Sequence, residues 1–159
     1  MNIVIRTDAS VHIGSGHVMR CLVLAKALKQ QGHDVRFITR IQQGDMVDFI
    51  SQQQFRVMIL ELPLTPLVPK NSADYSAWLQ VSELDDANNT IALIDNVDLM
   101  VVDHYGINTL WEQQVKTQLR CYIMAVDDLV RPHHVDMILD QTFSRKSSDY
   151  ISTAKHVLT

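Results

Sequence analysis

The chain has 159 residues, of which 47% are apolar and 20% are charged, and its formal net charge at pH 7 is −4. A chain of this length and composition is expected to form one soluble globular domain with its own hydrophobic core. The net charge is negative and the Lys and Arg residues are scattered along the chain, which argues against nucleic acid or an anionic membrane surface as the partner.

No apolar run approaches the roughly 18 residues that span a bilayer, and the N-terminus lacks the apolar stretch of a classical signal peptide. Two cysteines, Cys21 and Cys121, are too few for a disulfide framework and lack the spacing of metal ligands. We therefore expect a cytoplasmic protein that is neither exported nor embedded in a membrane.

The first unit expected in the chain is a strand, a loop and a helix. Ile3 to Ile5 is a short run rich in β-branched residues, which predicts a buried strand. A polar loop over residues 7–15 follows it. The helix is predicted to end near Gly32, and its single apolar stripe is formed by Val18, Cys21, Leu22, Ala25 and Leu28.

The loop of this unit is the first candidate binding site. Gly14 and Gly16 have no Cβ atoms to keep a ligand away from the backbone, and Ser15 is placed to cap the helix. Backbone N–H groups at a helix N-terminus point toward a bound ligand. We therefore expect Gly14, Ser15 and Gly16 to contact a substrate, although glycine-rich turns without this role are also common in doubly wound folds.

His17 lies in the first turn of the predicted helix. The partial positive charge at a helix N-terminus disfavours protonation, so we expect a largely neutral imidazole near pH 7, which is usable as a general base. The structural alternative is that His17 caps the helix or bonds a neighbouring strand. Asp8 and Arg20 flank it and form either a structural ion pair or part of the site, with Asp8 orienting the imidazole or a substrate hydroxyl and Arg20 supporting the loop.

Strands and helices alternate along the middle of the chain. Prolines at every third position, Pro63, Pro66 and Pro69, forbid a regular helix and predict an extended loop. In order, the expected elements are a strand at residues 35–39, a helix at 44–54, a strand at 57–60, the loop at 62–71, and helices at 75–83 and 86–95.

A second candidate site follows the predicted apolar strand at residues 99–102. This strand runs into Asp103, His104 and Tyr105, and open α/β sheets bind their ligands at the carboxyl ends of strands. The remaining elements are a helix at 107–119 with Asn108 as its cap, strands at 122–126 and 135–139, and a polar segment at 141–159. Asp127 and Asp128 end the strand at 122–126. We expect a solvated strand end or a helix cap there, because no third metal ligand is near them.

This alternation predicts an α/β fold, a Rossmann-like parallel sheet with right-handed crossovers and flanking helices.

Three segments resemble signatures of a known family. The string GSGHVMRCLVLAKAL, residues 14–28, resembles the G-x-G-H-x-x-R-C-L-x-L-A signature of the UDP-sugar hydrolases of pseudaminic acid biosynthesis. Residues 101–107 and 126–140 resemble two other signatures in the N-terminal domain of these enzymes, with Val135 standing where cysteine is frequent. The resemblance thus covers nearly the whole chain.

The resemblance implies a domain arrangement and a set of roles. Family members have two Rossmann-like domains in the GT-B arrangement and are about twice as long as this chain, as two domains of about 150 residues would be. It therefore implies an N-terminal catalytic domain over residues 1–145 and the start of a linker over 146–159, with the C-terminal nucleotide-binding domain missing. It makes His17 the catalytic base and places Tyr105 against the sugar, and it implies neither metal nor cofactor.

The implied reaction is hydrolysis of UDP-2,4-diacetamido-2,4,6-trideoxy-β-L-altropose by water, with inversion and C–O cleavage. UDP leaves as a stabilised anion that needs little or no proton, so one base can suffice where ordinary glycosidases use two carboxyl groups. Nothing in the sequence supplies a surface to neutralise the diphosphate. We therefore expect this half to fold by itself but to hydrolyse poorly.

Three alternatives remain open. A GT-B glycosyltransferase would bind the same kind of donor, but the loops show no apolar patch for docking to a membrane, which favours the hydrolase. A dinucleotide-dependent oxidoreductase would have a G-x-G-x-x-G fingerprint, and Gly14 and Gly16 match its first two glycines. Met19 stands where the third glycine should be, and the second strand ends in Thr39-Arg40 instead of an acidic residue. The chain as it stands could also be a non-catalytic domain.

Overall fold

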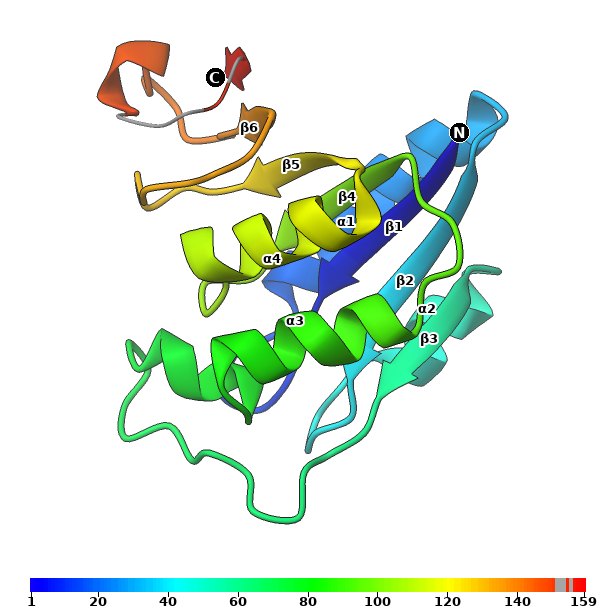
Figure 1. Ribbon diagram of the computed structural model, residues 1–159, viewed down its shortest axis with the longest axis vertical. Helices are drawn as coiled ribbons and strands as arrows, with labels where there is room; N and C mark the ends of the chain where they lie inside the picture. Colours follow the sequence, from blue (N-terminus) through cyan, green and yellow to red (C-terminus); the bar gives the residue numbers. More distant parts are fainter. Residues whose placement is uncertain (151–153, 155) are drawn as a thin grey trace.

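A computed structural model describes residues 1–150, 154 and 156–159, and these residues form one seven-stranded sheet in which all neighbouring strands are parallel (Figure 1). The order across the sheet is β3-β2-β1-β4-β5-β6-β7. The strands are β1 (Asn2–Thr7), β2 (Asp34–Arg40), β3 (Arg56–Leu60), β4 (Leu99–Asp103), β5 (Tyr122–Val126), β6 (Met137–Leu139) and β7 (His156–Leu158).

Helices cover both faces of this sheet. In Figure 1, α3 and α4 lie in front of the strands, and α1 and α2 lie behind them. The α-helices are α1 (Gly16–Gln30), α2 (Val47–Gln52), α3 (Glu83–Ala92) and α4 (Thr109–Leu119), and two short 3-10 helices are η1 (Tyr75–Leu79) and η2 (Ser147–Asp149). The predicted Rossmann-like α/β fold is therefore confirmed.

The two faces bury separate hydrophobic cores. On one face, Val18 and Leu22 of α1 pack in the same cluster as Ile5 and Phe37 of the sheet. The core of the other face includes Trp111 of α4, which is fully buried. Burial on both faces explains why the central strands are almost continuously apolar.

The predicted and observed elements differ most between β3 and α4. The helix predicted at residues 75–83 is replaced by the shorter η1. The chain then turns at Gln80, whose φ of 66° lies in the left-handed region. α3 begins at Glu83 because Ser82 caps it, its Oγ accepting from the Asp85 amide at 3.1 Å. The break between helices predicted at Leu84 was therefore wrong by a few residues.

The cap of α4 was also predicted incorrectly. Asn108 is the N-cap residue, but its side chain makes no capping hydrogen bond. Instead Glu83 Oε1 accepts from the amides of Asn108 and Trp111 at 2.8 and 3.0 Å. A carboxylate from α3 thus caps α4, which ties the two helices together.

The C-terminal segment contributes an edge strand that the sequence pattern did not reveal. β7 pairs with β6 in parallel, with Val157 opposite Ile138. The predicted linker at 146–159 includes residues 151–153 and 155, which lie outside the described residues, so the boundary at residue 145 stays a prediction. None of the helices in the described segments combines the length and hydropathy needed to cross a bilayer.

Candidate active site

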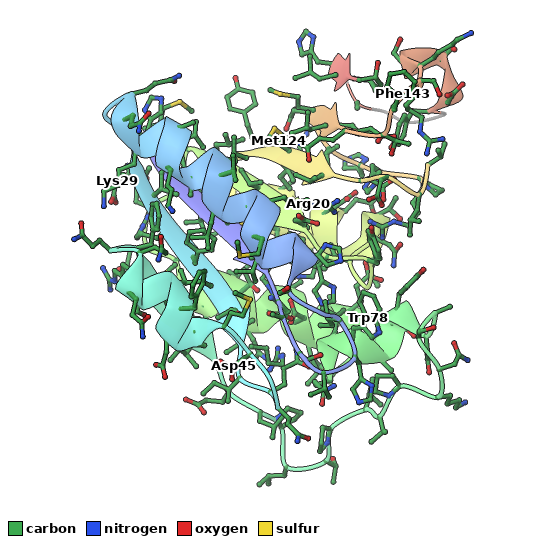
Figure 2. The ribbon with its side chains drawn as sticks, turned by 180° about the vertical axis from the view of Figure 1, so that it is seen from behind. Arg20, Lys29, Asp45, Trp78, Met124 and Phe143 are labelled. Atoms are coloured by element: carbon green, nitrogen blue, oxygen red, sulfur yellow. The ribbon has the colours of Figure 1, made fainter. Side chains whose placement is uncertain are left out.

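The carboxyl ends of β1, β4 and β5 meet at one edge of the sheet. β1 and β4 are adjacent although β2 and β3 separate them in the chain, so the direction of the crossovers reverses between them. Open α/β sheets bind ligands outside the carboxyl ends of the strands at such a switch point. α1 begins here, and Figure 2 shows Arg20 near its start and Lys29 near its other end.

His17 is held at this edge by Asp103, the last residue of β4. The imidazole Nδ1 lies 2.5 Å from Asp103 Oδ1, and His17 is 7% exposed. Its Nε2 makes no hydrogen bond with any residue that the structure describes. Asp8 was one candidate for orienting the imidazole, but Asp103 takes this place.

The ionisation of Asp103 fixes the proton on the imidazole. Burial favours the neutral carboxyl, but hydrogen bonds from Arg20 and His17 hold the pKa of Asp103 below its usual value. An ionised carboxylate can only accept, so Nδ1 carries the proton between the two groups. A neutral ring then has its lone pair on Nε2, as a general base requires.

Arg20 binds two carboxylates with one guanidinium. Its Nε and Nη2 donate to Asp103 at 2.5 and 2.6 Å, and its Nη1 donates to Asp128 Oδ2 at 3.0 Å. The hydrogen bond to Asp103 makes the largest contribution to raising the pKa of Arg20 above its ordinary value. Arg20 lies one turn after His17, so a single helix positions both side chains.

Tyr105 forms an aromatic wall beside His17. The two rings meet edge to face, with centroids 4.5 Å apart. The Tyr105 hydroxyl donates to Asp128 Oδ1. Burial, and then Asp128, raise the pKa of Tyr105 above its ordinary value, so the hydroxyl stays protonated. Because this proton is given to Asp128, the hydroxyl can only accept from a ligand.

Two further aromatic residues, Tyr75 and Trp78, come from η1. The Trp78 ring stacks near Tyr105 at a centroid distance of 5.8 Å and lies 6.2 Å from His17. Tyr75 packs against Trp78 at 4.8 Å. Gly106 allows η1 to come this close, because a Cβ there would lie 2.4 Å from the Tyr75 carbonyl oxygen. Trp78, which is buried, therefore belongs to the site as well as to the core.

The glycine-rich loop leaves the start of α1 open. Gly14 has a φ of 78°, and its amide donates to the Ser10 carbonyl at 2.8 Å, so a tight turn requires this glycine. Ser15 is the N-cap residue, but its side chain makes no capping bond, contrary to our expectation. Within the described chain, the amides of residues 16–18 have no acceptor. Of these three residues Gly16 is exposed, whereas His17 is buried and Val18 is fully buried, so the Gly16 amide is the one that a ligand can reach.

Asp8 and His104 lie beneath the site. Asp8 accepts from Arg6 Nη2 at 2.9 Å and from the Arg40 amide at 2.8 Å. His104 Nε2 lies 3.3 Å from Asp8 Oδ2, and its Nδ1 accepts from the Gly106 amide at 3.0 Å. With exposed fractions of 0% and 1%, these two side chains support the loops and do not reach the surface.

Apolar side chains do gather on the loops at this edge, contrary to the sequence interpretation. Val11, Leu64 and Val68 are 62%, 104% and 72% exposed. Val11 and Val68 line one hollow of about 200 Å³ between the β1–α1 loop and the proline-rich segment. The lack of an apolar loop patch therefore no longer separates a hydrolase from a glycosyltransferase.

The acidic pair after β5 is neither the solvated strand end nor the helix cap that we expected. Asp127 is fully buried and accepts from Arg131 Nε at 2.7 Å, while Asp128 binds Arg20 and Tyr105. Over residues 1–150, 154 and 156–159, no group of three or more His, Cys, Asp or Glu side chains could hold a metal ion. Parallel strands end at one edge, which is the signal that could have joined Asp128 to Asp103 before the structure was known.

His133 lies buried between two carboxylates on the α4 side of this edge. Its Nδ1 is 2.6 Å from Glu112 Oε1, and its Nε2 is 3.6 Å from Asp127 Oδ2. Burial opposes a charge on the ring, but Asp127 and Glu112 raise the pKa of His133 above its ordinary value. The folded chain therefore favours the imidazolium form.

This arrangement predicts that stability depends on pH. Since the folded-state pKa of His133 is raised, its stabilisation is complete below the unfolded value of about 6.5 and is lost as the pH rises through the folded value. We expect the difference in unfolding free energy between the unchanged chain and His133→Gln to be largest near about pH 6 and to shrink toward about pH 9. Urea unfolding of both chains across this pH range measures the difference in unfolding free energy. A difference that stays constant with pH would contradict the prediction.

Comparisons with known proteins found a curated relative that is similar in sequence to this chain. No family model matches the chain. A curated relative, the UDP-2,4-diacetamido-2,4,6-trideoxy-beta-L-altropyranose hydrolase of Campylobacter jejuni, is 29% identical over 150 residues. The matched part covers 94% of this chain and 45% of the relative. Over nearly its whole length the chain is thus similar to part of a UDP-sugar hydrolase, and it spans less than half of that protein.

Proposed function

We propose that this chain is the catalytic N-terminal half of a UDP-sugar hydrolase and that His17 is the base that activates the attacking water. The observation that carries the proposal is the His17–Asp103 pair, 2.5 Å apart at the switch point of the sheet. The similarity to the Campylobacter jejuni hydrolase supports a UDP-linked diacetamido-trideoxy-hexose as the substrate, in the pseudaminic acid pathway.

In this mechanism His17 Nε2 takes a proton from water as the water oxygen attacks the anomeric carbon. The bond between that carbon and the diphosphate oxygen breaks, and UDP leaves with the electron pair. The attack comes from the opposite side, so the configuration inverts. Asp103 keeps the imidazole oriented and stabilises the imidazolium that forms, since it accepts from Nδ1 throughout.

The surroundings of His17 suit this substrate. The Gly16 amide at the exposed start of α1 can bind an oxygen atom that is negative or becomes so as UDP departs. Gly14, Ser15 and Gly16 are exposed, so a ligand can reach this loop. Tyr105 presents its ring beside His17, where an aromatic side chain can pack against a deoxygenated sugar.

The nucleotide is assigned to a second domain that the described chain does not contain. In this proposal the GT-B partner domain follows the linker and binds UDP, while the first domain holds the sugar and the base. The observation in favour is that the matched part covers 45% of the relative. A cytoplasmic location suits a substrate of this kind.

The test compares this chain alone with the same chain expressed together with the coding sequence that follows residue 159. With the UDP-sugar and no acceptor, the longer protein is expected to release UDP and a free sugar of inverted anomeric configuration, read by NMR. The 159-residue chain is expected to do so poorly.

Two results would overturn parts of the proposal. UDP release only when a sugar acceptor is added would identify a glycosyltransferase instead. Tight binding of UDP by the 159-residue chain, measured by calorimetric titration, would show that the nucleotide site lies in this half.

A further inference from the structure

The side chains around His17 place one negative and one positive group directly against the ring. Asp103 Oδ1 lies 2.5 Å from Nδ1, and Arg20 Nη2 lies 3.3 Å from the same atom. A guanidinium cannot lose its proton in a protein, so Arg20 is positive at every working pH. The imidazole therefore faces a carboxylate whose charge is already neutralised.

Apart from Asp128, which binds Arg20, the other groups that face His17 and Asp103 are uncharged. Tyr105 packs against the ring from the loop after β4, and its hydroxyl keeps the proton that it donates to Asp128. Trp78 approaches from η1 and carries no charge. The Cys21 thiol lies 3.4 Å from Asp103 Oδ2, and burial together with Asp103 raises the pKa of Cys21 well above its ordinary value. Arg20 is thus the cation that opposes Asp103.

Asp128 completes the arrangement from β5. It accepts from Arg20 Nη1 at 3.0 Å, on the side of the guanidinium away from Asp103, and from the Tyr105 hydroxyl. This hydrogen bond to Asp128 fixes the guanidinium, so that its Nε and Nη2 can donate to both carboxylate oxygens of Asp103. Asp128 also adds a second negative charge, held against the guanidinium that lies beside His17.

We propose that Arg20 is a positioning residue that keeps His17 in the neutral, proton-accepting form, by neutralising Asp103 while leaving it free to orient Nδ1. Without the guanidinium, the buried carboxylate would favour the imidazolium, which has no lone pair on Nε2. The sign of each charge then predicts opposite effects of two substitutions. Removal of Arg20 favours protonation of His17, and removal of the Asp128 charge disfavours it.

The test is an NMR titration of the His17 ring in the 159-residue chain, with its signals identified by their loss in His17→Gln. Arg20→Gln is expected to raise the titration midpoint by about one pH unit or more, since an uncompensated charge at this distance has an effect of that size. Asp128→Asn is expected to lower it. Lys26→Gln, which removes a positive charge from the exposed side of the same helix, is expected to leave it unchanged.

A midpoint that is unmoved in Arg20→Gln, or that moves in the same direction in both variants, would overturn the inference. Loss of structure cannot imitate the expected result, because it would bring both variants toward the same free-histidine behaviour. The consequence for catalysis rests on the proposed function: the acidic limb of the pH profile of kcat/KM should move with the midpoint. If the ring responds as expected but no hydrolysis occurs, the proposed function fails and the role of Arg20 stands.

Discussion

Replacement of His17 by Gln is expected to lower kcat for UDP release by about 10²- to 10⁴-fold in the UDP-sugar hydrolase that we propose this chain belongs to. Glutamine can still donate to Asp103 from its amide, so the packing between α1 and β4 is retained. It has no basic nitrogen to take a proton from water. The loss should therefore appear in kcat, with KM little changed, in an assay of UDP release.

His33→Gln is the matched control. His33 follows α1 and lies at the opposite edge of the sheet, where its Nδ1 is 3.4 Å from the N-terminal amine. The same exchange there should leave kcat and KM unchanged. Near-normal turnover by His17→Gln would remove this histidine from the mechanism, and an equal loss in His33→Gln would point to a general effect on folding.

Replacement of Asp86 by Asn is expected to lower the free energy of unfolding by about 3–5 kcal/mol, the cost of breaking a buried ion pair on one side. Asp86, on α3, is fully buried and accepts from Arg6 Nη2 at 2.8 Å, from Arg40 Nη2 at 2.9 Å and from Trp111 Nε1 at 3.0 Å. Asparagine presents a neutral amide to two buried guanidinium groups. Urea unfolding of the 159-residue chain, followed by tryptophan fluorescence, measures the loss.

Asp95→Asn supplies the comparison. Asp95 is exposed just beyond α3, and surface substitutions of this kind change stability by about 0.5 kcal/mol or less. A loss below about 1 kcal/mol in Asp86→Asn would mean that Asp8, the other carboxylate that binds Arg6, is enough to neutralise the buried arginines. This network is connected to the loop that bears His104, because Asp8 contacts both Arg6 and His104.

Local patterns in the sequence determined the strand–loop–helix unit and the alternation that makes a parallel sheet. The runs at residues 3–5 and 99–102 are apolar because both faces of these strands are covered, and this property is visible without coordinates. The same reasoning placed His17 in the first turn of α1 and Tyr105 after β4. We treated the two loops as separate candidate sites, although parallel strands end at one edge of a sheet and this geometry could have joined them.

Only the tertiary structure decided which side chains these residues meet. His17 takes its partner from Asp103, 86 residues away, and not from Asp8, which the buried Arg6 holds below the surface. Trp78 reaches the site because η1 packs against Gly106. Such pairings depend on strand register and on how closely elements pack, and a pattern of apolar and polar residues along the chain records neither of these.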